Sequence, residues 1–175
     1  MVQADMTIEQ CATVTDEQNN TPVLMLDFDG CLHELGEPAI DENFCVLDNP
    51  RLFRWMPILR QLLEPYPEVR LIISSDWRRI LDDETLIRLL GSLGKRFYGV
   101  VETYGPSWHD EILTEVQRRG LNRWIALDDH PSIAIKSRRN WRFISYSPDS
   151  GLSDQRVQQE LKRKLNRLTK SKERS

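Results

Sequence analysis

The sequence contains little cysteine, glycine or proline and no long apolar run. The 3 cysteines are odd in number and form no C-x-x-C pair, which excludes a disulfide framework and a zinc knuckle. Sparse cysteine is typical of the reducing cytoplasm, where we predict that the protein resides. The 8 glycines and 9 prolines are too few for a low-complexity chain. The apolar runs are far shorter than the ~18 residues of a membrane span, and residues 1–20 lack the features of a secretory signal, so no membrane contact is expected.

What is present fits a single globular domain. The chain has 175 residues, of which 39% are hydrophobic and 29% are charged. A domain of this size buries roughly 70% of the surface that its unfolded chain exposes, so it needs no disulfide or structural metal. We expect a flexible segment at residues 1–20, an α/β domain at residues 21–169 and a basic tail at residues 170–175.

Charge is divided unevenly along the chain. Residues 1–155 hold 16 Lys/Arg and 25 Asp/Glu, a balance of -9, whereas residues 156–175 hold 8 and 2, a balance of +6. The acidic body argues against a protein that binds nucleic acid over its whole surface. We interpret the basic end as a solvated helix face, and a contact of this helix with nucleic-acid phosphates is the alternative.

Short apolar runs alternate with helical patterns. Runs rich in branched residues predict buried strands at 22–28, 69–75, 97–101, 123–129 and 141–147. Apolar residues at helical spacing predict helices at 51–64, 82–93 and 110–118, followed by a last helix that Ser153 caps and that buries Val157, Leu161, Leu165 and Leu168. Strands separated by helices require right-handed crossovers. The sequence therefore predicts a doubly wound, Rossmann-like α/β fold: a mainly parallel five-stranded sheet with helices on both faces.

Polar residues follow three of the predicted strands, at 27–30, 74–76 and 128–129. Ligands of a parallel sheet bind beyond the carboxyl ends of its strands, so these residues are expected to meet. Asp27 and Asp29 lie close enough to repel each other, and a magnesium ion between them, or a proton on one of them, would relieve the repulsion. A D-x-D-G string by itself is also an ordinary turn at a strand end.

Three segments, taken in order, carry a family resemblance. VLMLDFDGCL, LIISS and IALDD, within residues 22–147, resemble the first, second and fourth motifs of the haloacid dehalogenase (HAD) superfamily. LDFDGCLH, ISSDWR and LDDH, with GLSDQRVQQELKRKL near the end, look most like the small phosphatase-type domains that also occur in bacterial RNA-repair proteins. The resemblance implies a magnesium-dependent phosphomonoester phosphatase that acts through an aspartyl phosphate on a phosphorylated substrate.

The resemblance also implies individual roles. Asp27 would be the nucleophile, and Asp29 would be the general acid and base. Ser74 would hold a phosphate oxygen, and Ser75 is the alternative because strand alternation directs only one of the two hydroxyls to the site.

Magnesium is the cofactor that the resemblance implies. Asp128, with Asp129 behind it, would hold Mg²⁺ together with Asp27 and the backbone carbonyl of Asp29.

The third motif of the superfamily, a Lys or Arg before the fourth strand, has no direct counterpart. His109 lies about where that cation would fall, and we predict that it supplies the charge, with activity highest below about pH 6.5. The candidate substitutes from other loops are Lys95, Arg96, Arg78 and Lys136. Arg78 is also predicted to contact the substrate phosphate, with a solvated helix start as the alternative.

The sequence leaves no room for a substantial cap domain. Only about 20 residues, Cys31 to Pro50, separate the first motif from the next helix, and about seven, Glu102 to Trp108, follow the third strand. An open site accepts a phosphate on a bulky molecule, which favours nucleic-acid 3′-phosphate ends or phosphoproteins over small metabolites. Two alternatives are a non-catalytic binding or regulatory domain, which would explain the missing Lys, and a module that binds nucleic-acid ends through the basic tail.

The last predictions concern the histidines and tryptophans near these motifs. His33 and His130 are predicted to be ordinary polar surface residues. Trp77 and Trp108 lie near the predicted site, where they pack at its rim or stack on a base or sugar.

Overall fold

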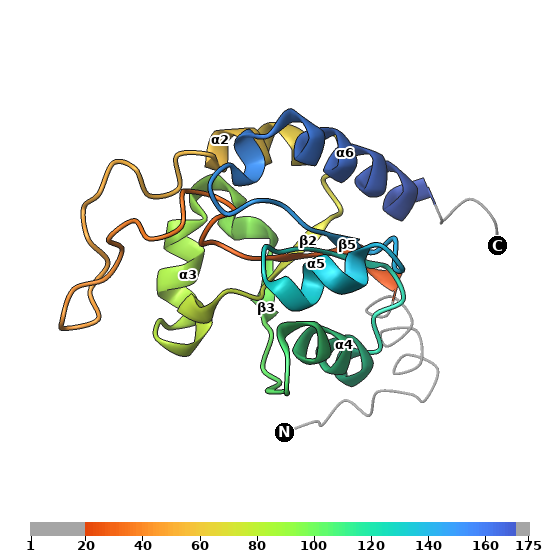
Figure 1. Cartoon of the computed structure of the whole chain (residues 1–175), viewed down its shortest axis with the longest axis horizontal. Helices are drawn as coiled ribbons and strands as arrows, with labels where there is room; N and C mark the ends of the chain where they lie inside the picture. The colour runs from red at the N-terminus through yellow and green to blue at the C-terminus, as the bar shows by residue number, and fades with distance from the viewer. Residues whose placement is uncertain (1–19, 171–175) are drawn as a thin grey trace, which may run out of the picture.

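The structure, a computed structural model, describes residues 20–170 and contains one five-stranded sheet (Figure 1). All strand pairs are parallel and the order is β3-β2-β1-β4-β5. The strands are β1 (Val23–Leu26), β2 (Arg70–Ile73), β3 (Phe97–Val100), β4 (Trp124–Leu127) and β5 (Phe143–Ile144). The predicted doubly wound α/β fold is confirmed. Residues 1–19 of the segment predicted to be flexible and residues 171–175 of the predicted basic tail lie outside the described residues.

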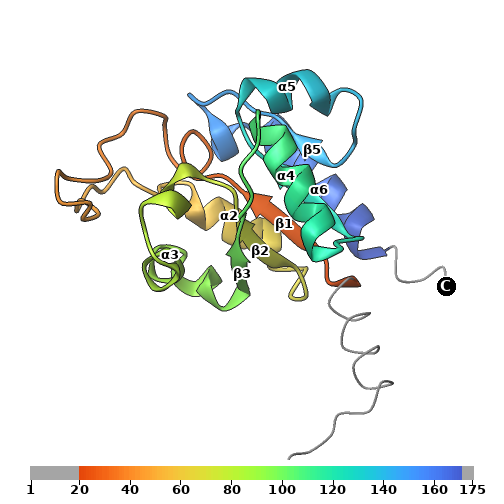
Figure 2. The same cartoon turned by 90° about the horizontal axis from the view of Figure 1, so that it is seen from below.

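Helices cover both faces of the sheet. They are α2 (Met56–Leu63), α3 (Asp83–Leu89), α4 (Trp108–Arg119), α5 (Pro131–Ser137) and α6 (Gln155–Lys170). Helices α2 and α6 lie side by side on one face, and α4 and α5 lie on the other (Figures 1 and 2). Short 3-10 turns span Asp76–Arg79, Gly91–Arg96 and Gly151–Ser153. No helix within residues 20–170 is long and apolar enough to cross a membrane.

Each strand contributes to two separate cores because its side chains alternate between the faces. Leu24 and Leu26 of β1 pack in the core beneath α2 and α6, whereas Val23 and Met25 pack in the core beneath α4. All four side chains are fully buried. Burial of each is worth about 1.5–3 kcal/mol, which explains why β1 is a continuous apolar run.

Two helices are shorter than predicted. The helix predicted at 51–64 begins at Met56, because Phe53 has a left-handed backbone (φ 56°) and Pro57 fits the first turn of a helix but not its interior. The helix predicted at 82–93 ends at Leu89, because Gly91 turns the chain with φ 54° and a 3-10 turn follows.

The prediction for the start of the last helix was wrong. Ser153 donates its hydroxyl to the carbonyl of Ser150 inside a 3-10 turn, and the Asp154 carboxylate accepts from the backbone N–H of Arg156 at 2.8 Å instead. The predicted apolar stripe of α6 is confirmed as buried: Val157, Leu161, Leu165 and Leu168.

The segment between the first motif and α2 forms an arm that extends from the body of the molecule (Figure 1). Within this arm a single antiparallel bridge joins Ile40 and Val46. In agreement with the prediction, the described part of the chain holds no substantial cap domain.

Candidate active site

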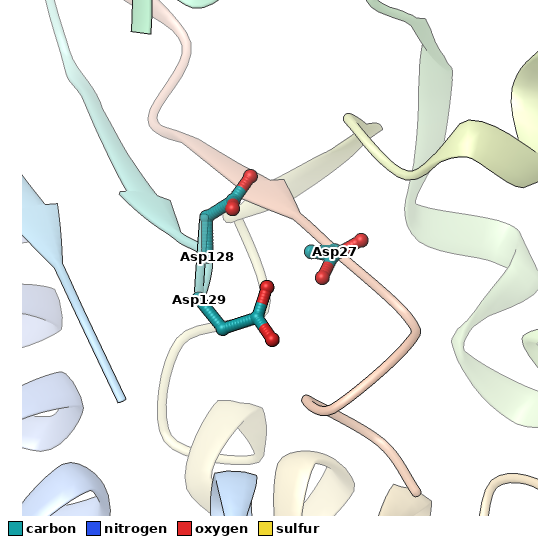
Figure 3. Close-up of side chains that lie close together, drawn as sticks. All are labelled: Asp27, Asp128 and Asp129. Atoms are coloured by element: carbon teal, nitrogen blue, oxygen red, sulfur yellow. The ribbon is translucent and has the colours of Figure 1, made fainter. Parts of the chain in front are cut away.

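Three aspartates meet at the carboxyl edge of the sheet (Figure 3). Asp27 follows β1, and Asp128 and Asp129 follow β4, so the acids come from two neighbouring strands. Their ligand oxygens all lie within 4.8 Å of one another. Strands β2 and β3 lie on one side of β1, and β4 and β5 lie on the other. The switch point of the sheet is therefore between β1 and β4, which is where ligands bind in open α/β sheets.

Burial makes this cluster electrostatically unfavourable on its own. The pKa of Asp27 is raised well above its usual range, first by burial and then by the charges of Asp128 and Asp129. Burial raises the pKa of Asp128 to about 7, and it also raises the pKa of Asp129. Near neutral pH the cluster therefore needs either protons or a cation that neutralises its charge.

The residues of the cluster fit a hard divalent cation. Asp128 accepts a hydrogen bond from the backbone N–H of His130 at 2.8 Å through Oδ1, while its buried Oδ2 has no hydrogen-bond partner within residues 20–170. Gly30 provides space, since a Cβ at this position would lie 2.7 Å from Asp129 Oδ2. Carboxylate oxygens are the ligands that Mg²⁺ prefers, so the donor set agrees with the predicted cofactor.

A tyrosine from the end of the sheet contacts the predicted nucleophile. The hydroxyl of Tyr146 donates to Asp27 Oδ2 at 3.2 Å, and both side chains are buried. Burial raises the pKa of Tyr146 well above its usual value, so the hydroxyl keeps its proton and remains a donor. One oxygen of Asp27 is thereby held in place.

The carboxylate of Asp29 is held separately from the cluster, by contacts with two other side chains. His33 Nε2 lies 3.1 Å from Oδ1, and Trp77 Nε1 donates to Oδ2 at 2.8 Å. The prediction that His33 is a surface residue was wrong, because its side chain is fully buried against this carboxylate. Asp29 itself stays 32% exposed, so it combines a fixed orientation with access to solvent.

Aromatic rings pack against the His33 and Trp77 side chains that contact Asp29. Phe53 packs edge-to-face on Phe28 and Trp77 and also contacts His33, with ring centroids 5.2–5.4 Å apart. At the centre of these rings, the backbone of Phe53 is left-handed, with φ 56°. A non-glycine residue in this region is strained, and such strain is typical of functional sites.

The two serines after β2 are both buried beside the site. Ser74 is 2% exposed and Ser75 is fully buried, and neither hydroxyl has a hydrogen-bond partner in the described part of the chain. A buried hydroxyl without a partner costs about 1–3 kcal/mol, which an incoming acceptor oxygen would recover. Both hydroxyls thus remain candidates for binding a phosphate oxygen.

Arg78 is a buried cation behind these serines. It donates to the carbonyls of Ser74, Ser75 and Val101 at 2.6–2.9 Å, and its second amino group pairs with Glu111 at 2.6 Å. Burial raises the pKa of Asp128, and the charge of Arg78 offsets a small part of that rise, so Arg78 lies close enough to act on the acid cluster.

The other cations considered from the sequence have contacts outside the acid cluster within residues 20–170. The ring of His109 packs on Phe143, with ring centroids 4.8 Å apart, and its Nδ1 lies 3.1 Å from Lys136 Nζ. Lys136 also pairs with Asp110 at 3.2 Å. At the amino end of β2, the Arg96 guanidinium donates to backbone carbonyls of Leu63, Tyr66 and Val69. The backbone carbonyl of Lys95 accepts from the Arg70 side chain.

Sequence reasoning missed Tyr146, Glu111 and the role of His33. The position of His33, four residues after Asp29, was a local signal that could have been used. Tyr146 is separated from Asp27 by 119 residues, and Glu111 from Arg78 by 33, so neither contact had a sequence signal. His130 is exposed, as predicted, and its side chain caps α5.

The fold and the site define a class: an α/β domain of the haloacid dehalogenase type, which is a hydrolase fold. A scan of family models matches residues 23–157 to the HAD domain in Swiss Army Knife RNA repair proteins, and the chain belongs to this family. Searches of curated proteins and of solved structures found no match. The resemblance of the three sequence motifs to the haloacid dehalogenase superfamily is confirmed. Magnesium is the usual cation of this superfamily, and the acid cluster agrees with it.

The raised pKa values predict how stability changes with pH when divalent cations are removed with EDTA. The unfolded aspartates have pKa values near 3.9, whereas Asp128 titrates at about 7 in the folded protein. Between these values the folded state binds more protons, so the free energy of unfolding should fall as the pH rises from about 5.5 to 8. Urea unfolding across this range measures the effect. Added Mg²⁺ should stabilise the protein most at pH 8, and stability that rises steadily with pH in EDTA would contradict the prediction.

Proposed function

We propose that the protein is a magnesium-dependent phosphomonoester phosphatase that forms an aspartyl phosphate on Asp27. The observation that carries the proposal is the meeting of Asp27, Asp128 and Asp129, with ligand oxygens within 4.8 Å at the switch point of the sheet. Asp29 lies beside them as a separately held, partly exposed carboxyl group.

In the first step, an oxygen of Asp27 attacks phosphorus and the bond from phosphorus to the leaving alcohol oxygen breaks. Tyr146 binds Oδ2, which holds the carboxylate in one orientation. Asp29 protonates the leaving oxygen. Its hydrogen bonds from His33 and Trp77 fix the direction in which that proton is delivered.

In the second step, water attacks the phosphorus of the aspartyl phosphate. Asp29 takes a proton from this water, the bond between Asp27 and phosphorus breaks, and phosphate leaves with the Asp27 carboxylate restored. Asp29 is suited to both steps because its carboxyl group is 32% exposed and water reaches it.

Charge balance needs a cation, and Asp27, Asp128 and Asp129 would hold Mg²⁺. When bound, this ion neutralises the charge that accumulates as phosphate approaches the carboxylates. We assign the fixed protein cation to Arg78 instead of His109, because the Arg78 guanidinium binds the carbonyls of Ser74 and Ser75 beside the site, whereas the His109 ring packs on Phe143. Since its donors are taken by the carbonyls of Ser74 and Ser75, Arg78 acts by charge and by fixing the serine backbone.

The substrate that we favour is a phosphate on a nucleic-acid end. The site lacks a cap within the described residues, and the family is named for its occurrence in RNA repair proteins. Five exposed basic residues of α6 offer a second contact for a nucleic-acid backbone: Arg156, Lys162, Arg163, Arg167 and Lys170. A protein phosphate and a small metabolite are the competing substrates.

A substrate panel tests the proposal. The protein is incubated with Mg²⁺ and with phosphorylated oligonucleotides, phosphopeptides or sugar phosphates, and released phosphate is measured with and without EDTA. We expect release from oligonucleotide ends that stops in EDTA. No release from any substrate, with Mg²⁺ binding retained, would favour a non-catalytic binding domain and overturn the proposal.

The hydrogen bonds to Asp29 give a further prediction. His33→Ala and Trp77→Phe each remove one donor, and we expect kcat to fall by about 10- to 100-fold with little change in KM, because a misdirected Asp29 delivers its proton poorly. Steady-state kinetics, with circular dichroism as a check on folding, measures this. Trp141→Phe is the control, since Trp141 precedes β5 at the amino end of the sheet, where its ring contacts Arg142 and Arg167. An unchanged kcat in both variants would mean that Asp29 needs no such orientation.

A further inference from the structure

A pocket of about 460 Å³ lies between the 3-10 turn after β2 and the start of α4. Small-ligand sites typically have volumes of ~300–1,000 Å³, so the pocket is large enough for an aromatic ring system. The lining residues that matter here are Arg79, Tyr104, Ser107, Trp108, Glu111 and His130. None of them takes part in the proposed phosphoryl transfer.

His130 connects this pocket to the acid cluster. Its backbone N–H donates to Asp128 Oδ1 at 2.8 Å, and its ring stacks on Trp108 with centroids 5.6 Å apart and planes 23° apart. The pocket therefore adjoins Asp128, which belongs to the same acid cluster as Asp27.

The pocket offers an open aromatic face. Tyr104 is 74% exposed, although large aromatic side chains are normally covered. The Arg79 guanidinium lies 5.2 Å from the centre of the Tyr104 ring and 4.7 Å from the centre of the Trp108 ring. Since Tyr104 remains 74% exposed beside this contact, its ring is available for stacking.

Ion pairs hold Arg79 in this position. It bonds to Asp76 at 2.7 Å and to Glu111 at 3.0 Å, and Glu111 is itself fixed by Arg78 and by the backbone N–H of Gly105. The pocket thus combines the Arg79 cation, which ion pairs hold in a fixed position, with two aromatic rings and polar groups at its rim. Aromatic rings and arginine planes are the surfaces on which proteins stack unpaired bases, and polar groups at the rim can bond to base edges.

We propose that this pocket binds the nucleobase of the nucleotide whose phosphate is removed, with Tyr104 as the stacking platform. The inference rests on the proposed function and narrows its substrate to a nucleotide end that keeps its base. A phosphotyrosyl peptide, whose ring would also stack, is the competing occupant that the test must exclude.

The test compares two short 3′-phosphorylated oligoribonucleotides that differ only in whether the terminal sugar carries a base. For the unmodified protein we expect a lower KM with the base, by roughly 5- to 150-fold, the equivalent of ~1–3 kcal/mol for one stacked base. Tyr104→Ala should reduce this ratio to near one, whereas Tyr104→Phe, which keeps the ring, should retain most of it. Phe44→Ala is the matched control, because Phe44 is also an exposed aromatic residue, 65% exposed, on the distant arm.

Direct binding separates this inference from the proposed function. A terminal 2-aminopurine loses fluorescence when it stacks, so quenching by the unmodified protein and its loss in Tyr104→Ala support the pocket even if no phosphate is released. Equal KM values with and without the base, together with quenching that Tyr104→Ala leaves unchanged, would overturn the inference. It would also be overturned if Tyr104→Ala raised only the KM for a phosphotyrosyl peptide.

Discussion

Asp27→Asn is expected to lower kcat for phosphate release by about 10⁴-fold or more, while the protein stays folded. An amide keeps the shape of the side chain but is a poor nucleophile, and loss of the nucleophile removes the whole covalent route. The free energy of unfolding in EDTA at pH 7.5 should rise, because the substitution removes a buried carboxyl group whose ionisation is opposed by burial and by the charges of Asp128 and Asp129.

Asp48→Asn provides the matched control, since Asp48 is an exposed aspartate on the arm. It should leave kcat and the free energy of unfolding unchanged within error. Phosphate release by Asp27→Asn at a rate within tenfold of the unmodified protein would mean that another group attacks phosphorus.

Arg78→Met is expected to lower the free energy of unfolding by about 3–5 kcal/mol. The Arg78 and Glu111 side chains are only 3% and 6% exposed, so removing the guanidinium leaves a buried carboxylate with less compensation. The carbonyls of Ser74, Ser75 and Val101 also lose a donor, which adds a desolvation cost and loosens the serine backbone. Urea unfolding at fixed pH measures the loss.

An exposed ion pair provides the control for this loss of unfolding free energy. Arg54 and Glu34 are 48% and 43% exposed, so Arg54→Met should cost no more than about 1 kcal/mol. The double variant Arg78→Met, Glu111→Gln should recover part of the loss, because the unpaired carboxylate is gone. A loss in Arg78→Met as small as that in Arg54→Met would show that Glu111 is compensated by Arg79 alone.

The sequence by itself determined the sheet, its two cores and the acidic ends of β1 and β4. Apolar runs such as Val23–Leu26 have to be buried on both faces, and short parallel strands need helical crossovers, so the layer structure follows from local patterns. The meeting of Asp27 with Asp128 followed as well, because carboxylates at the ends of parallel strands share one edge of the sheet. Helix boundaries were predicted less well, because φ at Phe53 depends on the ring cluster that surrounds it.

The tertiary structure alone decided which partners hold the acids. Tyr146 reaches Asp27 across 119 residues, and Arg78 is buried against Glu111 instead of lying free to contact substrate. It also decided that the ring of His109 packs on Phe143. Spacing along a chain fixes which face of an element is apolar, whereas the partner of a buried polar group depends on which distant segments pack together. That packing is set by the whole fold, and the sequence pattern around each residue carries no record of it.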